Sequence, residues 1–219
     1  MRTAINHIMK LVMIKFMRIV TRVVMRVVMR NVIIFGALVL FMALPVQAND
    51  LAENLRSNSY VLLMRHASAP GVGDPPNYTL DDCKTQRNLD SEGRRQAAVV
   101  GDWLRKQGVL SANVFSSLWC RCKETAALLN FNGYRIEPSL GSFFDEMAKA
   151  PESNRALQRF IDQHLKTKGD RALILVTHHV NILEFSGENV ASGDMVLVKV
   201  DARGNRLSHV VIPRPNERG

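Results

Sequence analysis

Two uninterrupted apolar segments, each running straight into histidine, constrain this chain more than any other feature. Residues 60–64 continue into Arg65-His66, and residues 173–176 continue into Thr177-His178-His179. An apolar run without alternation is typical of a strand that is buried on both faces of a sheet. Open α/β sheets bind ligands at the carboxyl ends of their strands. We therefore expect the two histidine segments to lie close together at one edge of a sheet.

Strand-like and helix-like segments alternate along the rest of the chain. Residues 67–89 are rich in Gly, Pro, Asn and Asp and predict a long loop, and residues 49–58 read as a polar lead-in. This alternation predicts an α/β class, with a three-layer sandwich around a mostly parallel central sheet. We expect helices over residues 91–107, 119–130 and 154–166, the first of them capped by Asp90. Further strands are expected at residues 114–115, 134–136, 195–200 and 207–212.

The amino-terminal region has the composition of a secretory signal. Residues 32–44 are uncharged and too few to span a bilayer comfortably. Small residues at the −3 and −1 positions predict cleavage after Ala48, which makes residues 1–48 a signal peptide and 49–219 the mature domain. The alternative is an uncleaved anchor. Because the basic stretch before residue 31 is long for a signal, translation from Met29 or Met25 is a further hypothesis.

The formal charge of +9 is unevenly distributed. Seven basic residues and no acidic residue lie within residues 1–48, which leaves a net charge of +2 for residues 49–219. A basic leader is a targeting feature more often than a nucleic-acid arm. We therefore expect no nucleic-acid partner, membrane contact only through the signal segment, and a periplasmic or secreted location.

Arginine and histidine at the strand ends predict phosphoryl chemistry. Guanidinium groups clamp the oxygens of a phosphoryl group in bidentate fashion, and a neutral imidazole can attack phosphorus to form a covalent intermediate. Arg65 and His66 follow one strand, His178 follows another, and Arg121 lies in the segment 116–121 that leaves a third. Such a set supplies positive charge without a metal or an organic cofactor.

Four blocks of the sequence occur in the order and at the spacing of a known family. Residues 61–67 (VLLMRHA), 87–97, 116–126 and 176–178 resemble the successive motifs of the histidine phosphatase superfamily, or phosphoglycerate mutase-like group. Ala67 and His179 stand where the family has Gly, and Ser117 stands where it has Pro. Residues 181–188 resemble the corresponding segment of exported bacterial members. The resemblance runs from about residue 60 to residue 200 and implies the phosphoglycerate mutase-like fold.

The resemblance also implies roles for individual residues. It makes His66 the nucleophile and places Arg65, Arg121 and His178 on the phosphate, with Asn88 as a further substrate-binding residue. Small family members carry a general-acid Glu after the third strand, where this chain has Ser142. The nearest glutamate is Glu146 and the nearest aspartate Asp145. We expect Glu146 to be the acid. Alternatively, the substrate has a leaving group that needs little protonation, as phosphohistidine does.

The three cysteines lie within the mature part and fit an oxidising compartment. On a helix, Cys120 and Cys122 point about 200° apart, so they cannot both face one neighbour. Cys122 shares a stripe with the apolar residues 126 and 129. We therefore predict a Cys83–Cys120 disulfide with Cys122 reduced and buried, and keep Cys83–Cys122 as the alternative.

The function expected from these features is a metal-independent phosphatase with a phosphohistidine intermediate on His66. Its substrate would be a phosphomonoester or phosphohistidine, carried by a phosphorylated small molecule, an envelope sugar phosphate or a phosphoprotein. Two alternatives remain. One is a non-catalytic phosphate-binding member of the same fold. The other is a phosphoglycerate-type mutase, against which export argues because that reaction uses cytoplasmic metabolites.

Overall fold

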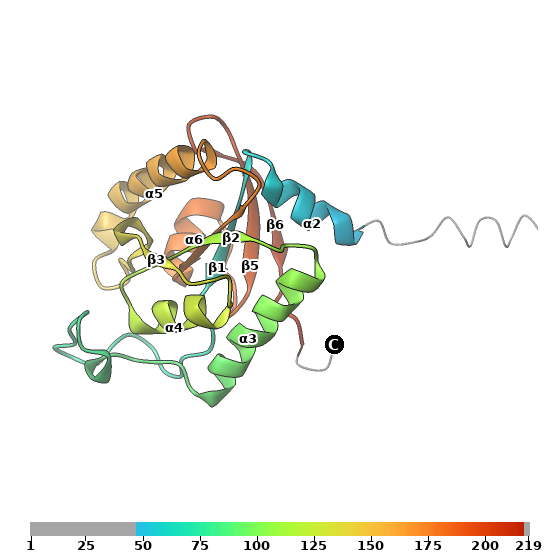
Figure 1. Cartoon of the computed structure of the whole chain (residues 1–219). Coiled ribbons are helices and arrows are strands. Elements are labelled where there is room, and N and C mark those ends of the chain that lie inside the picture. The colour runs from blue at the N-terminus through green and yellow to red at the C-terminus, as the bar shows by residue number, and fades with distance from the viewer. Residues whose placement is uncertain (1–46, 217–219) are drawn as a thin grey trace, which may run out of the picture. The chain divides into compact units, whose positions relative to one another are not determined.

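The protein, seen in a computed structural model that describes residues 47–216, is built on one sheet with strand order β3-β2-β4-β1-β5-β6 (Figure 1). Strands β1 to β4 are parallel, whereas β5 is antiparallel to β1, and β6 to β5. The predicted sheet is thus present, with both apolar segments at its centre. The strands are β1 Tyr60–Arg65, β2 Ala112–Ser116, β3 Arg135–Ile136, β4 Ala172–Thr177, β5 Met195–Val200 and β6 Arg206–Ile212.

Helices cover both faces of the sheet, as the three-layer prediction requires (Figure 1). They are α2 Gln47–Arg56, α3 Ser91–Lys106, α4 Cys120–Leu128, α5 Ala150–Leu165 and α6 His179–Ser186, with short 3-10 helices at Cys83–Thr85, Pro138–Leu140 and Met147–Lys149. Alternate residues of β1 enter two separate cores. Leu62 and Met64 pack with residues of α2, α3 and α4, whereas Val61 and Leu63 pack with residues of α5 and α6. The class of fold is therefore α/β, as predicted.

Two helices were not expected from the sequence. The polar lead-in predicted over residues 49–58 is wrong, because α2 buries Leu51, Ala52 and Leu55 in the same core as Leu62. The buried ammonium of Lys168 donates to the carbonyls of Leu55 and Arg56 at 2.9 Å and so caps this helix. Helix α6 begins directly after His178, in a segment for which no helix was predicted.

The predicted signal segment lies outside the described residues, except that Gln47 and Ala48 form the start of α2. Within residues 47–216, no helix is long and apolar enough to cross a membrane.

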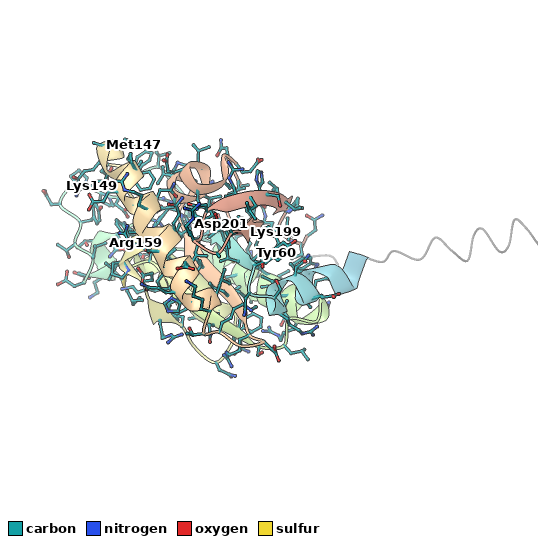
Figure 2. All side chains as sticks on the ribbon, turned by 90° about the horizontal axis from the view of Figure 1, so that it is seen from above. Tyr60, Met147, Lys149, Arg159, Lys199 and Asp201 are labelled. Atoms are coloured by element: carbon teal, nitrogen blue, oxygen red, sulfur yellow. A yellow bond between two sulfur atoms is a disulfide. The ribbon has the colours of Figure 1, made fainter. Side chains whose placement is uncertain are left out.

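The antiparallel pairing of β5 fixes the main chain at the end of β1. At the far end of the pair, Tyr60 stands opposite Lys199, whose ammonium lies 5.9 Å from the centre of the tyrosine ring (Figure 2). At the near end, the amide of Arg65 donates to the carbonyl of Asp194, and the amide of Gly193 donates to the carbonyl of His66. The backbone that carries Arg65 and His66 is therefore held by the segment before β5.

Candidate active site

The two histidine segments meet where β1 and β4 end. Arg65 stands opposite Thr177 in the parallel register, and the amide of His66 donates to the carbonyl of Thr177 at 3.0 Å. His66 and His178 are both buried, and their ring centres lie 5.5 Å apart in an edge-to-face arrangement. The two histidine segments therefore lie together, as the strand pattern predicted.

Residues of α3 and α4 hold the turn that follows β1. The amide of Ala67 donates to Thr125 Oγ1 of α4, and the amide of Ser68 donates to Gln96 Oε1 of α3. A Cβ on Gly93 would lie only 2.0 Å from the carbonyl oxygen of Ser68, so the close approach of α3 to this turn requires glycine. Residues of α3 and α4 thus pack against the backbone that carries His66.

A cavity of about 330 Å³ opens over the ends of these strands. Its positively charged and imidazole lining groups come from four separate segments of the chain. They are Arg65 and His66 after β1, Arg87 in the long loop, Arg121 in α4, and His178 and His179 after β4. The rest of the lining consists of Gly71, Val72, Gly73, Asp74, Ser142, Phe144, Asp145 and Asn189. The cavity thus suits an anionic ligand.

His66 is neutral and has one ring nitrogen free of partners. Its Nδ1 lies 2.8 Å from the carbonyl of Ala67. A carbonyl can only accept, so Nδ1 carries the proton. Burial lowers the pKa of His66 to about 3 against the raising effect of that hydrogen bond, and the nearby arginines add to the decrease. Within residues 47–216, Nε2 has no hydrogen-bond partner, which leaves it as the nucleophilic atom of the ring.

His178 is also neutral and is held from the β2–α4 segment. Its Nε2 is hydrogen-bonded to the hydroxyl of Ser117 at 2.9 Å, and the ring of Trp119 meets it edge-on with centres 5.0 Å apart. Burial first, and then the charges of its neighbours, lower the pKa of His178 well below its usual value. The hydroxyl of Ser117 thus orients this histidine.

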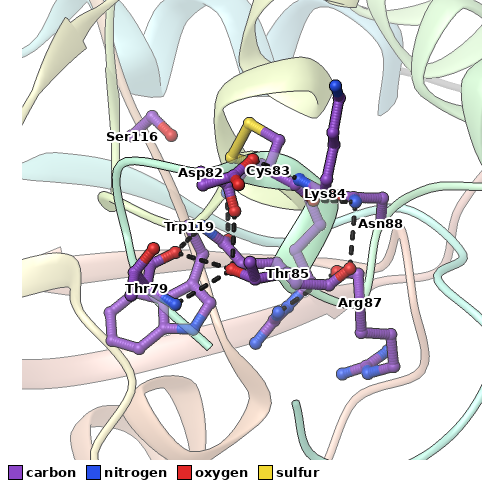
Figure 3. The surroundings of a disulfide bond; sticks show 12 residues. Thr79, Asp82, Cys83, Lys84, Thr85, Arg87, Asn88, Ser116 and Trp119 are labelled. Carbon is purple, nitrogen blue, oxygen red and sulfur yellow. Dashed lines mark hydrogen bonds between the residues drawn. A yellow bond between two sulfur atoms is a disulfide. The ribbon is translucent and has the colours of Figure 1, made fainter. Parts of the chain in front are cut away.

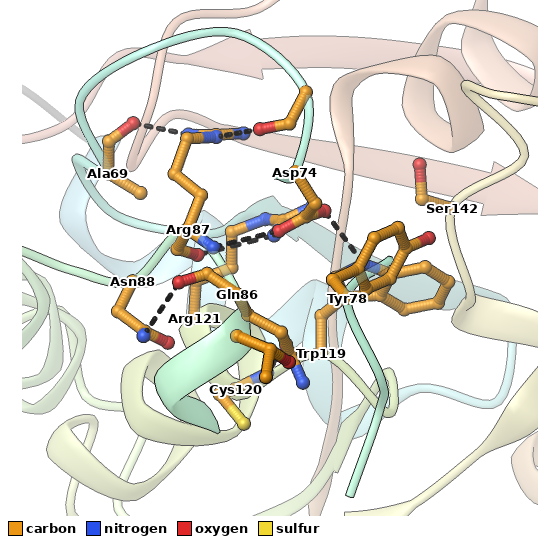
Figure 4. A network of polar contacts seen from close by, with 12 residues as sticks. Ala69, Asp74, Tyr78, Gln86, Arg87, Asn88, Trp119, Cys120, Arg121 and Ser142 are labelled. Carbon is orange, nitrogen blue, oxygen red and sulfur yellow. Dashed lines mark hydrogen bonds and ion pairs between the residues drawn. The ribbon is translucent and has the colours of Figure 1, made fainter. Parts of the chain in front are cut away.

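Arg121 is buried in an ion pair with Asp74 (Figure 4). Its Nη1 donates to both carboxylate oxygens, at 2.8 and 3.0 Å. Burial would raise the pKa of Asp74, but hydrogen bonds from the Arg121 side chain, the Arg87 amide and Trp119 outweigh it and hold that pKa below its usual value. Asp74 is therefore ionised, and it is the most buried carboxylate in the cavity lining.

Arg65 and Arg87 are fixed by main-chain carbonyls. Arg65 Nη1 donates to the carbonyl of Val190 at 2.7 Å. Arg87 Nε donates to the carbonyl of Gly73 at 2.8 Å, and its Nη1 donates to the carbonyl of Ala69. The buried Nε atoms of Arg65 and Arg121 have no protein partner among the described residues. Three guanidinium groups thus line one cavity, and the Nε donors of Arg65 and Arg121 are free to bind a ligand.

Two predicted site residues do not line the cavity. Asn88 was expected to bind substrate, but its amide donates to the carbonyls of Cys83 and Gln86 instead. The preceding residue, Arg87, takes the place in the cavity. Arg87 heads the same sequence block, and its charge was the signal that could have identified it.

Glu146, predicted as the general acid, is absent from the cavity lining. It begins a 3-10 helix, its side chain is 63% exposed, and it pairs with Lys149 at 2.7 Å. Its neighbour Asp145 lines the cavity, where it accepts a hydrogen bond of 3.4 Å from the Tyr78 hydroxyl. The carboxyl groups in the cavity lining are therefore those of Asp74 and Asp145.

The long loop is tied to α4 by the predicted disulfide. Cys83 and Cys120 are bonded to each other (Figure 3). Cys122 is free and buried, and its burial raises the pKa of the thiol to about 12. Beside the disulfide, the amide of Cys120 donates to Gln86 Oε1 at 2.9 Å. The loop that carries Asp74 and Arg87 is thus joined covalently to the residue before Arg121.

The fold is that of several solved phosphatases. The protein histidine phosphatase SixA, solved with tungstate, is 19% identical, with 71% of this chain and 97% of SixA covered at a TM-score of 0.50. A mycobacterial glucosyl-3-phosphoglycerate phosphatase is 15% identical, with 72% and 99% covered at a TM-score of 0.50. A mycobacterial protein described as hydrolase 1 gives the same identity, coverage and TM-score. At these identities the likeness concerns the fold.

No family model matches the sequence, and no curated protein matches it either.

Proposed function

We propose that this chain is a phosphatase that hydrolyses a phosphomonoester or phosphohistidine through a covalent phosphoryl group on His66. One observation carries the proposal: a buried, neutral histidine with a free Nε2 lies in a cavity with three guanidinium groups. The fold shared with SixA and with the glucosyl-3-phosphoglycerate phosphatase supports it, and SixA was solved with tungstate, a phosphate-like oxyanion.

The reaction proceeds in two displacements at phosphorus. In the first, the lone pair of His66 Nε2 forms a P–N bond while the bond between phosphorus and the leaving atom breaks, and the leaving group takes that electron pair. In the second, water attacks phosphorus, the P–N bond breaks, and the pair returns to Nε2. The water gives up one proton to solvent and inorganic phosphate is released. Arg65, Arg87 and Arg121 offset the negative charge that develops on the phosphoryl oxygens.

The carboxyl groups of the site favour leaving groups that depart without a strong acid. Asp74 is ionised and bound to Arg121, and Asp145 is exposed. Neither is a buried, neutral carboxyl group of the kind that protonates a poor leaving group. Phosphohistidine and aryl phosphates, whose leaving groups are a readily protonated imidazole and a phenolate, are therefore the proposed best substrates.

The proposed location is the periplasm or the extracellular space, reached through the signal segment at residues 1–48. The Cys83–Cys120 disulfide supports it, because such bonds persist in oxidising compartments. A phosphoprotein that carries phosphohistidine would be the substrate there, because an envelope sugar phosphate leaves as an alkoxide that needs protonation. The same location argues against mutase activity on cytoplasmic metabolites.

The test is turnover of an aryl phosphate by the full chain and by His66→Ala. The matched control is His164→Ala, because His164 is also held through Nδ1 and a main-chain carbonyl but lies on α5 outside the cavity lining. We expect turnover to be lost in the first variant and kept in the second. Equal turnover in all three proteins would refute the proposed nucleophile, and phosphate binding without turnover in the unaltered chain would support the non-catalytic alternative.

A further inference from the structure

Asp74 holds Arg121 by one nitrogen of the guanidinium group. Both carboxylate oxygens contact Nη1, and a third acceptor, the carbonyl of Arg87, lies 3.3 Å from the same nitrogen (Figure 4). The two side chains are each only 4% exposed. Nε of Arg121 is buried and has no protein partner among the described residues. The protein thus occupies one end of the guanidinium fork and leaves the other donors unused.

The same carboxylate also contacts two other parts of the cavity wall. Its Oδ2 accepts a 3.0 Å hydrogen bond from the indole nitrogen of Trp119, the residue whose ring meets His178. Its Oδ1 accepts a 2.9 Å hydrogen bond from the amide of Arg87. Asp74 therefore connects the long loop, α4 and the environment of the second histidine, although it lies 47 residues from Arg121 in the sequence.

A fork that binds two phosphoryl oxygens must present two donors in a fixed plane. An arginine with no anchor would have to be ordered each time a ligand binds, and a displacement of about 1 Å in a positioning group can reduce the rate roughly 100-fold. We propose that Asp74 is a positioning residue, which holds Arg121 through Nη1 so that its remaining donors face the phosphoryl group. This inference rests on the proposed phosphatase function.

The test compares the full-length protein with Asp74→Asn, which keeps the shape of the side chain and removes its charge. The control is Glu124→Gln, because Glu124 lies on the same helix as Arg121 and pairs with Arg94 at 2.6 Å outside the cavity lining. Turnover of an aryl phosphate and inhibition by vanadate are measured together with the melting temperature. Asp74→Glu, which restores the charge, is the conservative variant.

We expect Asp74→Asn to lower kcat/KM roughly 10- to 100-fold, by analogy with the loss of an outer-shell partner that orients a ligand at a metal site. Affinity for vanadate, which adopts the five-coordinate geometry of the transition state, should fall in parallel. Asp74→Glu should recover part of both, and Glu124→Gln should match the unaltered chain. In an Arg121→Lys background, Asp74→Asn should have little further effect, because the two residues act as one unit.

Two results would overturn the inference. Tighter vanadate binding with undiminished turnover in Asp74→Asn would make Asp74 a competitor of the phosphoryl group. The same loss in the Arg121→Lys background as in the unaltered one would show that Asp74 does not act through Arg121. If the unaltered chain has no turnover, the proposed function fails. Calorimetric vanadate binding to the same variants then still tests the positioning role.

Discussion

The rings of His66 and His178 lie 5.5 Å apart because β1 and β4 are neighbours in parallel register and each histidine follows its strand directly. Both rings are buried and neutral. A pair of cations at this distance would repel each other and the surrounding arginines. The neutral state of the pair determines how the protein should respond to pH.

The first prediction concerns stability below neutral pH. The pKa of His66 is about 3 in the folded protein, below the usual 6.5, so the unfolded state binds more protons between these values. The stability that this group contributes is present above pH 6.5 and is lost as pH falls toward 3, by about 1.4 kcal/mol per pH unit inside the window. Denaturant unfolding at pH 6.5 and 5 should show a smaller loss for His66→Gln than for the unaltered chain. Equal losses would contradict the assignment.

The second prediction concerns Arg121. Arg121→Ala should reduce kcat more than Arg121→Lys, and both should be severe, on the order of 10²- to 10³-fold for the loss of one charge-stabilising donor. Lysine keeps the charge but lacks the planar fork. Steady-state turnover of an aryl phosphate measures this, and wild-type rates in both variants would remove Arg121 from the site.

A third prediction separates two adjacent residues of the long loop. Arg87→Ala should lower turnover strongly, because Arg87 lines the cavity and holds the carbonyls of Ala69 and Gly73. Asn88→Ala should stay within about twofold of the unaltered chain, since Asn88 donates to the carbonyls of Cys83 and Gln86 and does not line the cavity. Parallel kinetics decide between them, and the reverse order would restore the role first expected for Asn88.

The disulfide leads to a fourth prediction. Peptide mapping of the non-reduced protein should recover Cys83 linked to Cys120, with Cys122 alkylated only after unfolding. Cys83→Ser should lower the free energy of unfolding by about 2–4 kcal/mol, which is typical for a closed loop of this kind. Recovery of a Cys83–Cys122 peptide, or of three free thiols, would be incompatible with the pairing.

The sequence predicted the parts of the site that lie on regular elements. Buried apolar runs placed Arg65, His66 and His178 at strand ends, since parallel strands end at one edge of a sheet. Helical periodicity placed Cys120 and Cys122 on opposite faces and so predicted the disulfide that the structure contains. Local pattern was sufficient because each of these positions follows from the geometry of one element.

Loop residues were not predictable in this way. Asp74 lies in a segment of Gly, Pro and Asn without periodicity, and its place depends on contacts with Arg121 and Trp119 far along the chain. Glu146, expected to be the general acid, does not line the cavity, whereas its neighbour Asp145 does, and a 3-10 helix begins directly after Glu146. No local signal defines such a turn.

The most direct test of the central claim is to trap the phosphorylated protein. The full chain is mixed with a radiolabelled aryl phosphate, quenched in base within one turnover and digested, and the labelled peptide is sequenced. A phosphoryl group on His66 predicts acid-labile, base-stable label on the peptide that contains His66, and no label in His66→Ala. Label on another residue would contradict a phosphoryl intermediate on His66. Equal turnover by the unaltered chain and by His66→Ala would contradict it as well.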